Sequence, residues 1–591
     1  MALEENPKPG CDYCRPLPAE YKPAGLWGLS WWQWGMAALA LVFALPILVV
    51  VGSVFFVQTE VWQHLASTVL PTYLVNSLIL AVGVGIGVFI IGTGTAWLCA
   101  VCTFPGKRFF EWALILPLAV PGYIIAYTYT GLLDDGGPIQ STLRDLTGWS
   151  IGDYYFPQIR SITGAIIMLT LVLYPYVYML ARAAFLEQSA SALNVGRSLG
   201  LGPYRMFTKV ALPLARPAIV AGLSLAIMET LADYGTVQYF GIQTLTIGIF
   251  RTWFGLGDPT AAAQLSAILL TFVFVVVVLE RLSRRKARYQ HHGHWQARPT
   301  FVLSGTRGWL ATLACALPLL LGFLLPALML ARWTFDIIWH TDWAAFAVLT
   351  SRSVMLAAIT AILALILALI FAYGQRLLPG RFSAFMVRFA SMGYAIPGTV
   401  IAVGVIIPFA AFDNTLDSWM RAQFGFSTGL ILSGTLAALI FAYLVRFLAV
   451  SFNTVEAGLG RVRPSMDDAA RSMGLTPKTT LRRVHLPLIR GSLLTASLLV
   501  FVDVLKELPA TLVLRPFDFN TLAVRTFELA SDERLADASL PALMIVLAGL
   551  IPVILISRSI THAGDKTNSE LTAAPVERNL TKFTLKTQQN N

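Results

Sequence analysis

Charged residues are scarce in this chain of 591 residues. Asp, Glu, Lys and Arg make up 13% of it, whereas a soluble domain carries about 25%. Apolar residues reach 56% and the mean hydropathy is +0.68. This little charge cannot cover a water-soluble globule of such size, and the apolar content is too high for a disordered chain. The composition therefore excludes a soluble enzyme and indicates a polytopic membrane protein.

Cysteine is also scarce, with five residues in the whole chain. This number does not form a disulfide framework. Cys11 and Cys14 form one C-x-x-C pair and Cys99 and Cys102 another, but no second ligand cluster accompanies either. We interpret them as incidental thiols, and a weak metal or redox role stays open for Cys11 and Cys14. We expect no metal site and no cofactor.

Apolar runs long enough to span a bilayer occur twelve times. Their ranges are 34–57, 73–101, 110–130, 162–181, 217–239, 261–280, 309–331, 353–373, 385–410, 428–450, 492–514 and 541–560. Each should be helical, because lipid cannot satisfy an open backbone. The sequence predicts an all-α fold with about twelve transmembrane helices. Pro121-Gly122 and Pro397-Gly398 fall inside two of the runs, where proline kinks a helix.

The distribution of positive charge indicates which parts of the chain face the cytoplasm. The net charge is +11, and most Lys and Arg fall in alternate connections between the runs and at the two ends. Because such residues accumulate in cytoplasmic loops, we expect both termini in the cytoplasm and no nucleic-acid partner. The predicted parts are a cytoplasmic segment 1–33, a first half 34–280, a basic linker 281–308, a second half 309–562 and a disordered tail 563–591. Three histidines in the linker (His291, His292 and His294) are read as part of a solvated basic segment rather than as metal ligands.

The two halves form an internal repeat. Gly200 and Gly474 stand in similar segments, which gives an offset of 474 − 200 = 274. At the same offset Leu212-Pro213 matches Leu486-Pro487, and Pro105-Gly106 matches Pro379-Gly380. Six spans in each half give both halves the same orientation. The sequence therefore predicts a parallel repeat.

Each half carries a cytoplasmic loop that resembles the EAA loop of ATP-binding-cassette importer permeases. The matching residues are Asp468, Ala469, Ala470, Gly474, Leu486 and Pro487 in the second half, and Gly200, Leu212 and Pro213 in the first. The first half departs from the pattern, because Asn194 and Gly196 stand where the triplet should be. This departure leaves open whether both halves couple equally to an ATPase. Small residues allow a short helix to sit in a groove, glycine permits the turn after it, and proline suits the first turn of the next helix.

The resemblance implies a permease that is not itself an enzyme. The chain has no G-x-x-x-x-G-K-[ST] phosphate loop, so ATP hydrolysis would belong to two copies of a separate cytoplasmic ATPase subunit. A periplasmic solute-binding protein would deliver the cargo at a bacterial inner membrane. The stretches 229–235, 239–241 and 251–258 are similar to the ferric-iron branch. Thiamine, polyamine or another small solute remain alternatives, as does an ion-coupled secondary transporter.

Acidic residues recur within the predicted spans. Glu229 and Asp233 are spaced i, i+4, and Asp503 and Glu507 repeat the spacing in the second half. Such spacing places two side chains on one face of a helix. Charges in a membrane usually face a bundle interior or water, and hard cations prefer oxygen ligands.

We therefore predict that the four carboxylates, together with Tyr234, line a translocation path. The alternative is that the acids hold helices together or sit at a wet outer end, and Lys506 offers a partner for that role.

Overall fold

The computed structural model describes residues 31–56, 60–187, 198, 200–285 and 301–554. Cys11, Cys14, the three linker histidines and the predicted tail lie outside these residues. The described first half contains α1 (Trp31–Gly52), η2 (Ser53–Phe55), α2 (Glu60–Thr68), α3 (Leu70–Val101), α4 (Lys107–Ala113), η3 (Leu116–Ala119), α5 (Gly122–Leu133), α6 (Pro138–Thr147), α7 (Ile162–Glu187), α9 (Pro203–Met206), η4 (Phe207–Ala211), α10 (Leu212–Ala232), α11 (Gly235–Tyr239), α12 (Leu245–Phe254) and α13 (Pro259–Arg285).

The second half repeats this order. It contains α14 (Thr306–Leu319), η5 (Leu320–Leu324), α15 (Leu325–Ile337), α16 (Trp343–Leu377), α17 (Arg381–Ala390), η6 (Ser391–Ala395), α18 (Gly398–Phe424), α19 (Leu436–Gly460), α20 (Pro464–Ser472), α21 (Pro477–Thr480), η7 (Leu481–His485), α22 (Leu486–Leu505), α23 (Pro509–Leu514), α24 (Leu522–Ser531) and a last helix, Leu535–Ile554. Two short strands, β1 (Cys102–Thr103) and β2 (Phe301–Val302), pair in parallel.

The described residues contain 11 helices long and apolar enough to cross a membrane, or up to 12 if one bent pair counts as a span. This confirms the all-α polytopic prediction. The predicted span 110–130 is not one straight helix, because Lys107–Ala119 and Gly122–Thr147 meet at 92°. The run 385–410 is likewise divided into α17, η6 and α18. Both breaks coincide with a Pro-Gly pair, in which proline lies just before the new helix and glycine opens it.

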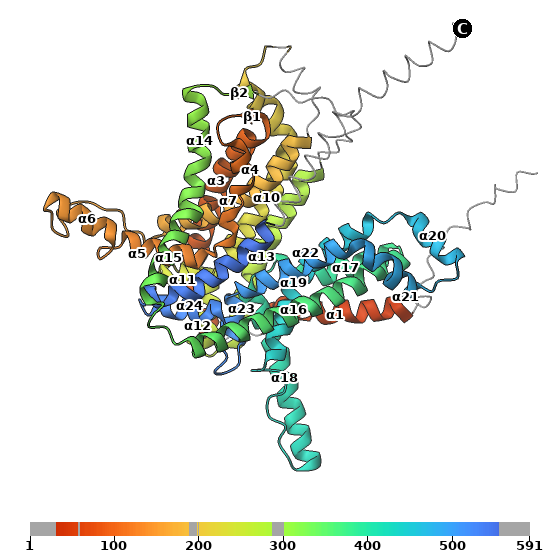
Figure 1. Ribbon diagram of the computed structural model, residues 1–591. Helices are drawn as coiled ribbons and strands as arrows, with labels where there is room; N and C mark the ends of the chain where they lie inside the picture. Colours follow the sequence, from red (N-terminus) through yellow and green to blue (C-terminus); the bar gives the residue numbers. More distant parts are fainter. Residues whose placement is uncertain (1–30, 57–59, 188–197, 199, 286–300, 555–591) are drawn as a thin grey trace, which may run out of the picture.

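The helices pack across the boundary of the sequence repeat. Residues of α1 and α13 belong to one apolar core with α16, α17, α18, α19 and α22 of the second half. Residues of α14, α15 and the last helix belong to the other core, with α3, α5, α7 and α10. Figure 1 shows α1, in red, along the second-half helices, and α14, in green, beside α3. Each half is therefore completed by helices of the other half.

Glycines bring the helices of the first core close together. A Cβ added at Gly92 of α3 would lie 2.8 Å from the carbonyl oxygen of Tyr174 in α7. One added at Gly222 of α10 would lie 2.8 Å from the Cα of Val177. Because lipid offers helices no hydrophobic reason to associate, close packing through small residues holds such bundles together.

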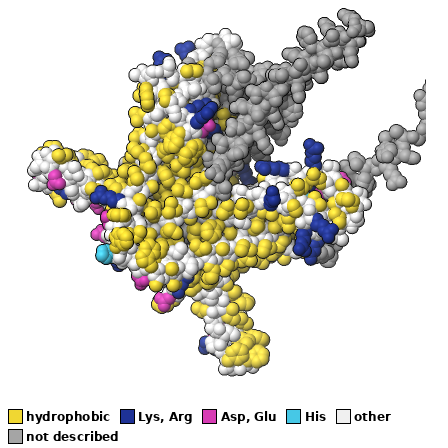
Figure 2. Space-filling view, viewed as in Figure 1, with side chains coloured by type: hydrophobic (Ala, Val, Ile, Leu, Met, Phe, Trp, Pro, Cys, Tyr) yellow, Lys and Arg dark blue, Asp and Glu magenta, His cyan; other side chains and the backbone are white. Residues whose placement is uncertain are grey.

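The outside of the bundle is apolar. Figure 2 shows hydrophobic side chains over most of the visible body, and Lys and Arg at the tip that carries α20 and α21. On α16, for example, Ile362 is 57% and Ile366 48% exposed. This distribution is that of a surface in contact with lipid.

Candidate functional site

The second-half loop carries a short exposed helix, α20. Asp468 and Ala469 are exposed on it, whereas Ala470 is buried against the body. The backbone after the helix turns at Gly474, whose φ of +76° lies in the left-handed region that glycine adopts without steric cost. Met473 is 70% exposed. Helix α20 therefore offers small and apolar side chains to a partner.

An ionic network ties α20 to the bundle. The carboxylate of Asp467 accepts a hydrogen bond from Nε of Arg376 at 2.9 Å and lies 2.6 Å from Nε2 of His485. Arg376, in the last turn of α16, also donates to the carbonyl oxygens of Leu459 (2.6 Å) and Val462 (2.9 Å). The network connects α16, the end of α19, α20 and η7. Helix α20 is thereby connected to two long helices, α16 and α19.

The first-half loop is described only in part. Asn194 and Gly196 lie outside the described residues. Gly200 has a φ of +73° and so matches Gly474.

The Leu-Pro pairs lie where the sequence predicts, in the first turns of α10 and α22. Each of these helices is, however, the continuation of a longer helix. The longer helices begin at Tyr204 and Pro477 and contain the π turns η4 and η7. The amide of Leu212 donates to the carbonyl oxygen of Phe207, five residues earlier, and that of Leu486 donates to Leu481 in the same way. A π turn next to proline is a recognised site of helix bending. The loop is thus joined to the long helix without a break.

The acidic pairs do not share a helix face, and that prediction is wrong. Helix α10 ends at Ala232, and Asp233 is extended with ψ of 130°. Helix α22 contains Asp503 and ends at Leu505, so Glu507 lies beyond it.

The physical reason is that the second acid of each pair caps the next short helix. The Asp233 carboxylate accepts the amides of Thr236 (3.0 Å) and Val237 (3.1 Å) in α11. The Glu507 carboxylate accepts the amide of Ala510 (3.0 Å) in α23. An acidic side chain at a helix start satisfies free amides and favours the positive end of the helix dipole.

The break between α10 and α11 and the break between α22 and α23 face each other across the boundary between the halves. They border a cavity of about 120 Å³ whose lining includes Glu229 and Asp233 from the first half and Arg446, Lys506 and Glu507 from the second. Residues from α5, α7, α10 and α19 also contribute, so neither half forms the cavity alone.

Cations of the second half neutralise the acids of the second half. A terminal guanidinium nitrogen of Arg446, on α19, lies 3.1 Å from each carboxylate oxygen of Glu507. Lys506 Nζ lies 2.9 Å from Oδ1 of Asp503. Lys506 therefore pairs with Asp503 and not with the adjacent Glu507. Asp503 is not part of the lining of this cavity.

Neither acid of the first half has a cationic partner among the described residues, and Glu229 differs from Asp233 in also lacking hydrogen bonds. Glu229 makes no ion pair and no hydrogen bond with the described residues, and it lies at the edge of both the central cavity and a smaller neighbouring one. Its carboxylate is therefore free to interact with a solute. Within the described part of the chain, no three His, Cys, Asp or Glu side chains come together as ligands for one metal ion. In this conformation the acids form a charged lining rather than a metal cage.

Tyrosines surround the acids. Tyr234 lines the cavity, and its buried ring packs 4.9 Å from that of Phe250 between centroids. Tyr123 also lines the cavity, and its buried hydroxyl has no hydrogen-bond partner among the described residues. These rings narrow the space and leave polar oxygens at its wall.

Three residues of the site were not predicted from the sequence: Arg446, Asp467 and His485. Arg446 could have been found, because it is an isolated cation inside the apolar run 428–450. Asp467 stands beside the predicted Asp468, and nothing in the sequence indicates which of the two faces the body. His485 directly precedes Leu486, and its pairing with Asp467 depends on how α20 folds back.

The chain matches the family model described as the binding-protein-dependent transport system inner membrane component. The match covers residues 91–289 and 364–567, one copy in each half. Because it spans more than half of the chain, the protein belongs to this family of permeases. The match confirms the resemblance based on the EAA-like loops, and it places the chain among membrane transport proteins rather than enzymes.

Two relatives are similar over most of this chain, and a third over a smaller part of it. The Fe(3+)-transport system permease protein FbpB 2 of Haemophilus influenzae is 28% identical over 488 residues, which are 82% of this chain and 89% of the relative. A putative ferric transport system permease protein, FbpB 1, of the same organism is 23% identical over 79% of this chain and 75% of the relative. The molybdenum transport system permease protein ModB of Escherichia coli is 27% identical over 38% of this chain and 96% of its own length.

Proposed function

We propose that this chain is the inner-membrane permease of an ATP-driven importer of ferric iron. The observation that carries the proposal is the similarity to FbpB 2, a ferric-iron permease by name, over 82% of this chain and across both halves. ModB covers only 38% of this chain while matching 96% of its own length. The fused two-half organisation thus supports the ferric-iron relatives over the molybdenum relative.

The central cavity supports a cationic cargo. Four carboxylates and two basic side chains lie in or next to it, so two negative charges remain if all are ionised. Carboxylate and phenol oxygens suit a hard trivalent cation. In the proposed path Glu229 offers the free carboxylate, and Asp233, Asp503, Glu507 and Tyr234 supply the surrounding charge and oxygens.

The coupling loops would receive the energy. In the proposal, two copies of a separate ATPase subunit bind α20 and the first-half loop. These two loops and both termini lie on the cytoplasmic side. ATP-driven movement of α20 reaches α16 and α22 through the Asp467 network. A ferric-ion-binding protein would deliver the cargo from the opposite, periplasmic side.

Uptake of radioactive ferric iron by iron-starved cells tests the proposal. Cells that lack this gene should lose uptake, and restoring the wild-type gene should recover it. Labelled molybdate taken up by the same cells is the matched control and should not change. Unchanged ferric uptake in a strain without another ferric route would refute the iron assignment, and lost molybdate uptake would transfer the cargo to an oxyanion.

A further inference from the structure

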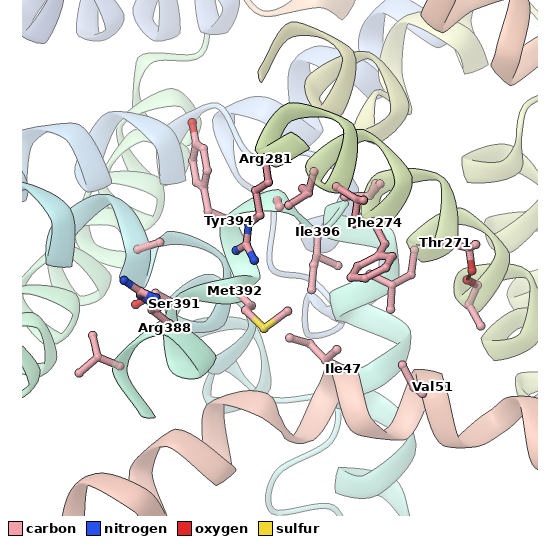
Figure 3. A pocket seen from close by; sticks show the side chains of 18 of the residues that line it. Ile47, Val51, Thr271, Phe274, Arg281, Arg388, Ser391, Met392, Tyr394 and Ile396 are labelled. Atoms are coloured by element: carbon pink, nitrogen blue, oxygen red, sulfur yellow. Dashed lines mark hydrogen bonds between the residues drawn. The ribbon is translucent and has the colours of Figure 1, made fainter. Parts of the chain in front are cut away.

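A second and much larger cavity lies beside the central one. It has a volume of about 1020 Å³ and is lined by α1 and α13 on one side and by α16, α17, η6 and α19 on the other. Figure 3 shows side chains from these separate helices directed into a common space. The volume is at the upper end of the ~300–1,000 Å³ typical of small-molecule pockets. The proposed transport function does not use this cavity.

The cavity has the form of a groove that runs along the apolar side of α13. Val51, Phe274 and Met392 line it and are 46%, 59% and 46% exposed. On α13 the lining extends from Gln264 to Arg281, which corresponds to about 26 Å at 1.5 Å per residue. This length is most of the ~30 Å hydrocarbon core of a bilayer. In a membrane, the groove is therefore accessible to acyl chains.

At the corresponding place in the other half, the last helix and η3 approach each other closely. There, a Cβ at Gly549 of the last helix would lie 3.0 Å from the carbonyl oxygen of Ala119 in η3. At the repeat offset of 274 the position equivalent to Gly549 is Val275, which is 49% exposed. A branched side chain at this position prevents the close approach that glycine permits. The two halves thus differ at this position of the repeat, which lies next to the lining residue Phe274.

Two arginines enter the groove at the end that leads to α20. Arg281 extends from the end of α13 and Arg388 from α17, and both are labelled in Figure 3. Neither forms an ion pair with a described residue. Arg388 is also a departure from the repeat, because the equivalent position in the first half is the fully buried Leu114. Glu456, near the end of α19, lines the same cavity and is exposed.

We propose that this groove binds phosphatidylethanolamine from the leaflet on the α20 side. Arg281 and Arg388 bind the phosphate, since guanidinium groups match phosphate oxygens in charge and geometry. The amine of the headgroup faces Glu456. The acyl chains lie along the exposed apolar wall that includes Val51, Phe274 and Met392.

Native mass spectrometry of the purified full-length chain, titrated with phosphatidylethanolamine, tests this site. Wild-type protein should bind one tightly held lipid. The double variant Arg281→Gln/Arg388→Gln should bind it about 100-fold more weakly, at about tenfold for each lost charged hydrogen bond. The control is Arg108→Gln on α4, an exposed arginine of the first-half counterpart of α17, and it should leave binding unchanged.

A second variant separates lost binding from misfolding. Val278→Trp fills the groove and keeps both arginines, so it should abolish binding without removing charge. Phosphatidylglycerol, which has no amine, should bind more weakly than phosphatidylethanolamine, and Glu456→Gln should remove that difference. Equal lipid binding by wild type and the arginine double variant, or unchanged binding after the groove is filled, would overturn the proposal. A preference for phosphatidylglycerol would overturn the headgroup assignment.

Discussion

Removal of Arg446 should destabilise the protein strongly. The side chain of Arg446 is 10% exposed and that of its partner Glu507 5%, and the charged groups lie 3.1 Å apart. Coulomb attraction at this distance is about 5 kcal/mol with an effective dielectric constant of about 20. Breaking a buried pair on one side leaves an uncompensated charge, at about 3–5 kcal/mol. Arg446→Met should lower the free energy of unfolding by that amount.

A double variant distinguishes the pair from simple packing. Arg446→Met with Glu507→Gln removes both charges, while the Gln carbonyl still accepts the amide of Ala510. Replacement of both partners by neutral groups is often close to neutral in stability. The double variant should therefore recover most of the loss, with a coupling free energy above about 2 kcal/mol.

Equilibrium unfolding of the purified chain in mixed micelles measures these differences. The control is Arg534→Gln, whose pair with Asp537 is 59% and 42% exposed, and it should change the free energy of unfolding by less than about 1 kcal/mol. Equal destabilisation of Arg446→Met and the double variant would show that the buried ion pair does not account for the loss.

Three further predictions concern transport. Glu229→Gln with Asp233→Asn should abolish ferric uptake while the ATPase subunits still copurify, and normal uptake would exclude these acids from the path. Gly474→Ala, at φ of +76°, should destabilise the turn after α20 by about 1 kcal/mol and reduce ATP-dependent transport. The control is Gly491→Ala in α22, where an added Cβ meets no atom within 4 Å, and it should be tolerated in the same assay. Asp467→Asn should weaken the ion pair with Arg376 and lower transport per ATP hydrolysed, and an unchanged ratio would show that the network does not transmit motion.

Hydropathy was sufficient to predict helices as the membrane-spanning elements and their approximate number, because lipid leaves the backbone no alternative. It could not predict the 92° bend near Pro121, since a proline inside an apolar run is compatible with either a kink or a complete break. The exchange of α1 and α14 between the halves was also not predictable. Packing partners depend on the shapes of helix surfaces, which a count of apolar residues does not contain.

The candidate site was predictable in its acids but not in its geometry. The spacing of Glu229 and Asp233 was read as one helix face on the assumption that α10 continues. The competing signal was local, because an aspartate three residues before Thr236 is also a helix-capping pattern. In the second half, the long-range partner of Glu507 was Arg446, on a different helix. Such a partner follows only from the tertiary structure.

In the proposed function, ATP hydrolysis by the ATPase subunits drives ferric iron through this permease. The most direct test is reconstitution of the chain with its ATPase subunits and a ferric-ion-binding protein in liposomes, with iron accumulation and ATP hydrolysis measured together. We expect iron to accumulate only when ATP and the loaded binding protein are both present, and not at all with the Glu229→Gln/Asp233→Asn variant. Accumulation driven by a proton or sodium gradient without ATP would contradict it and would indicate a secondary transporter.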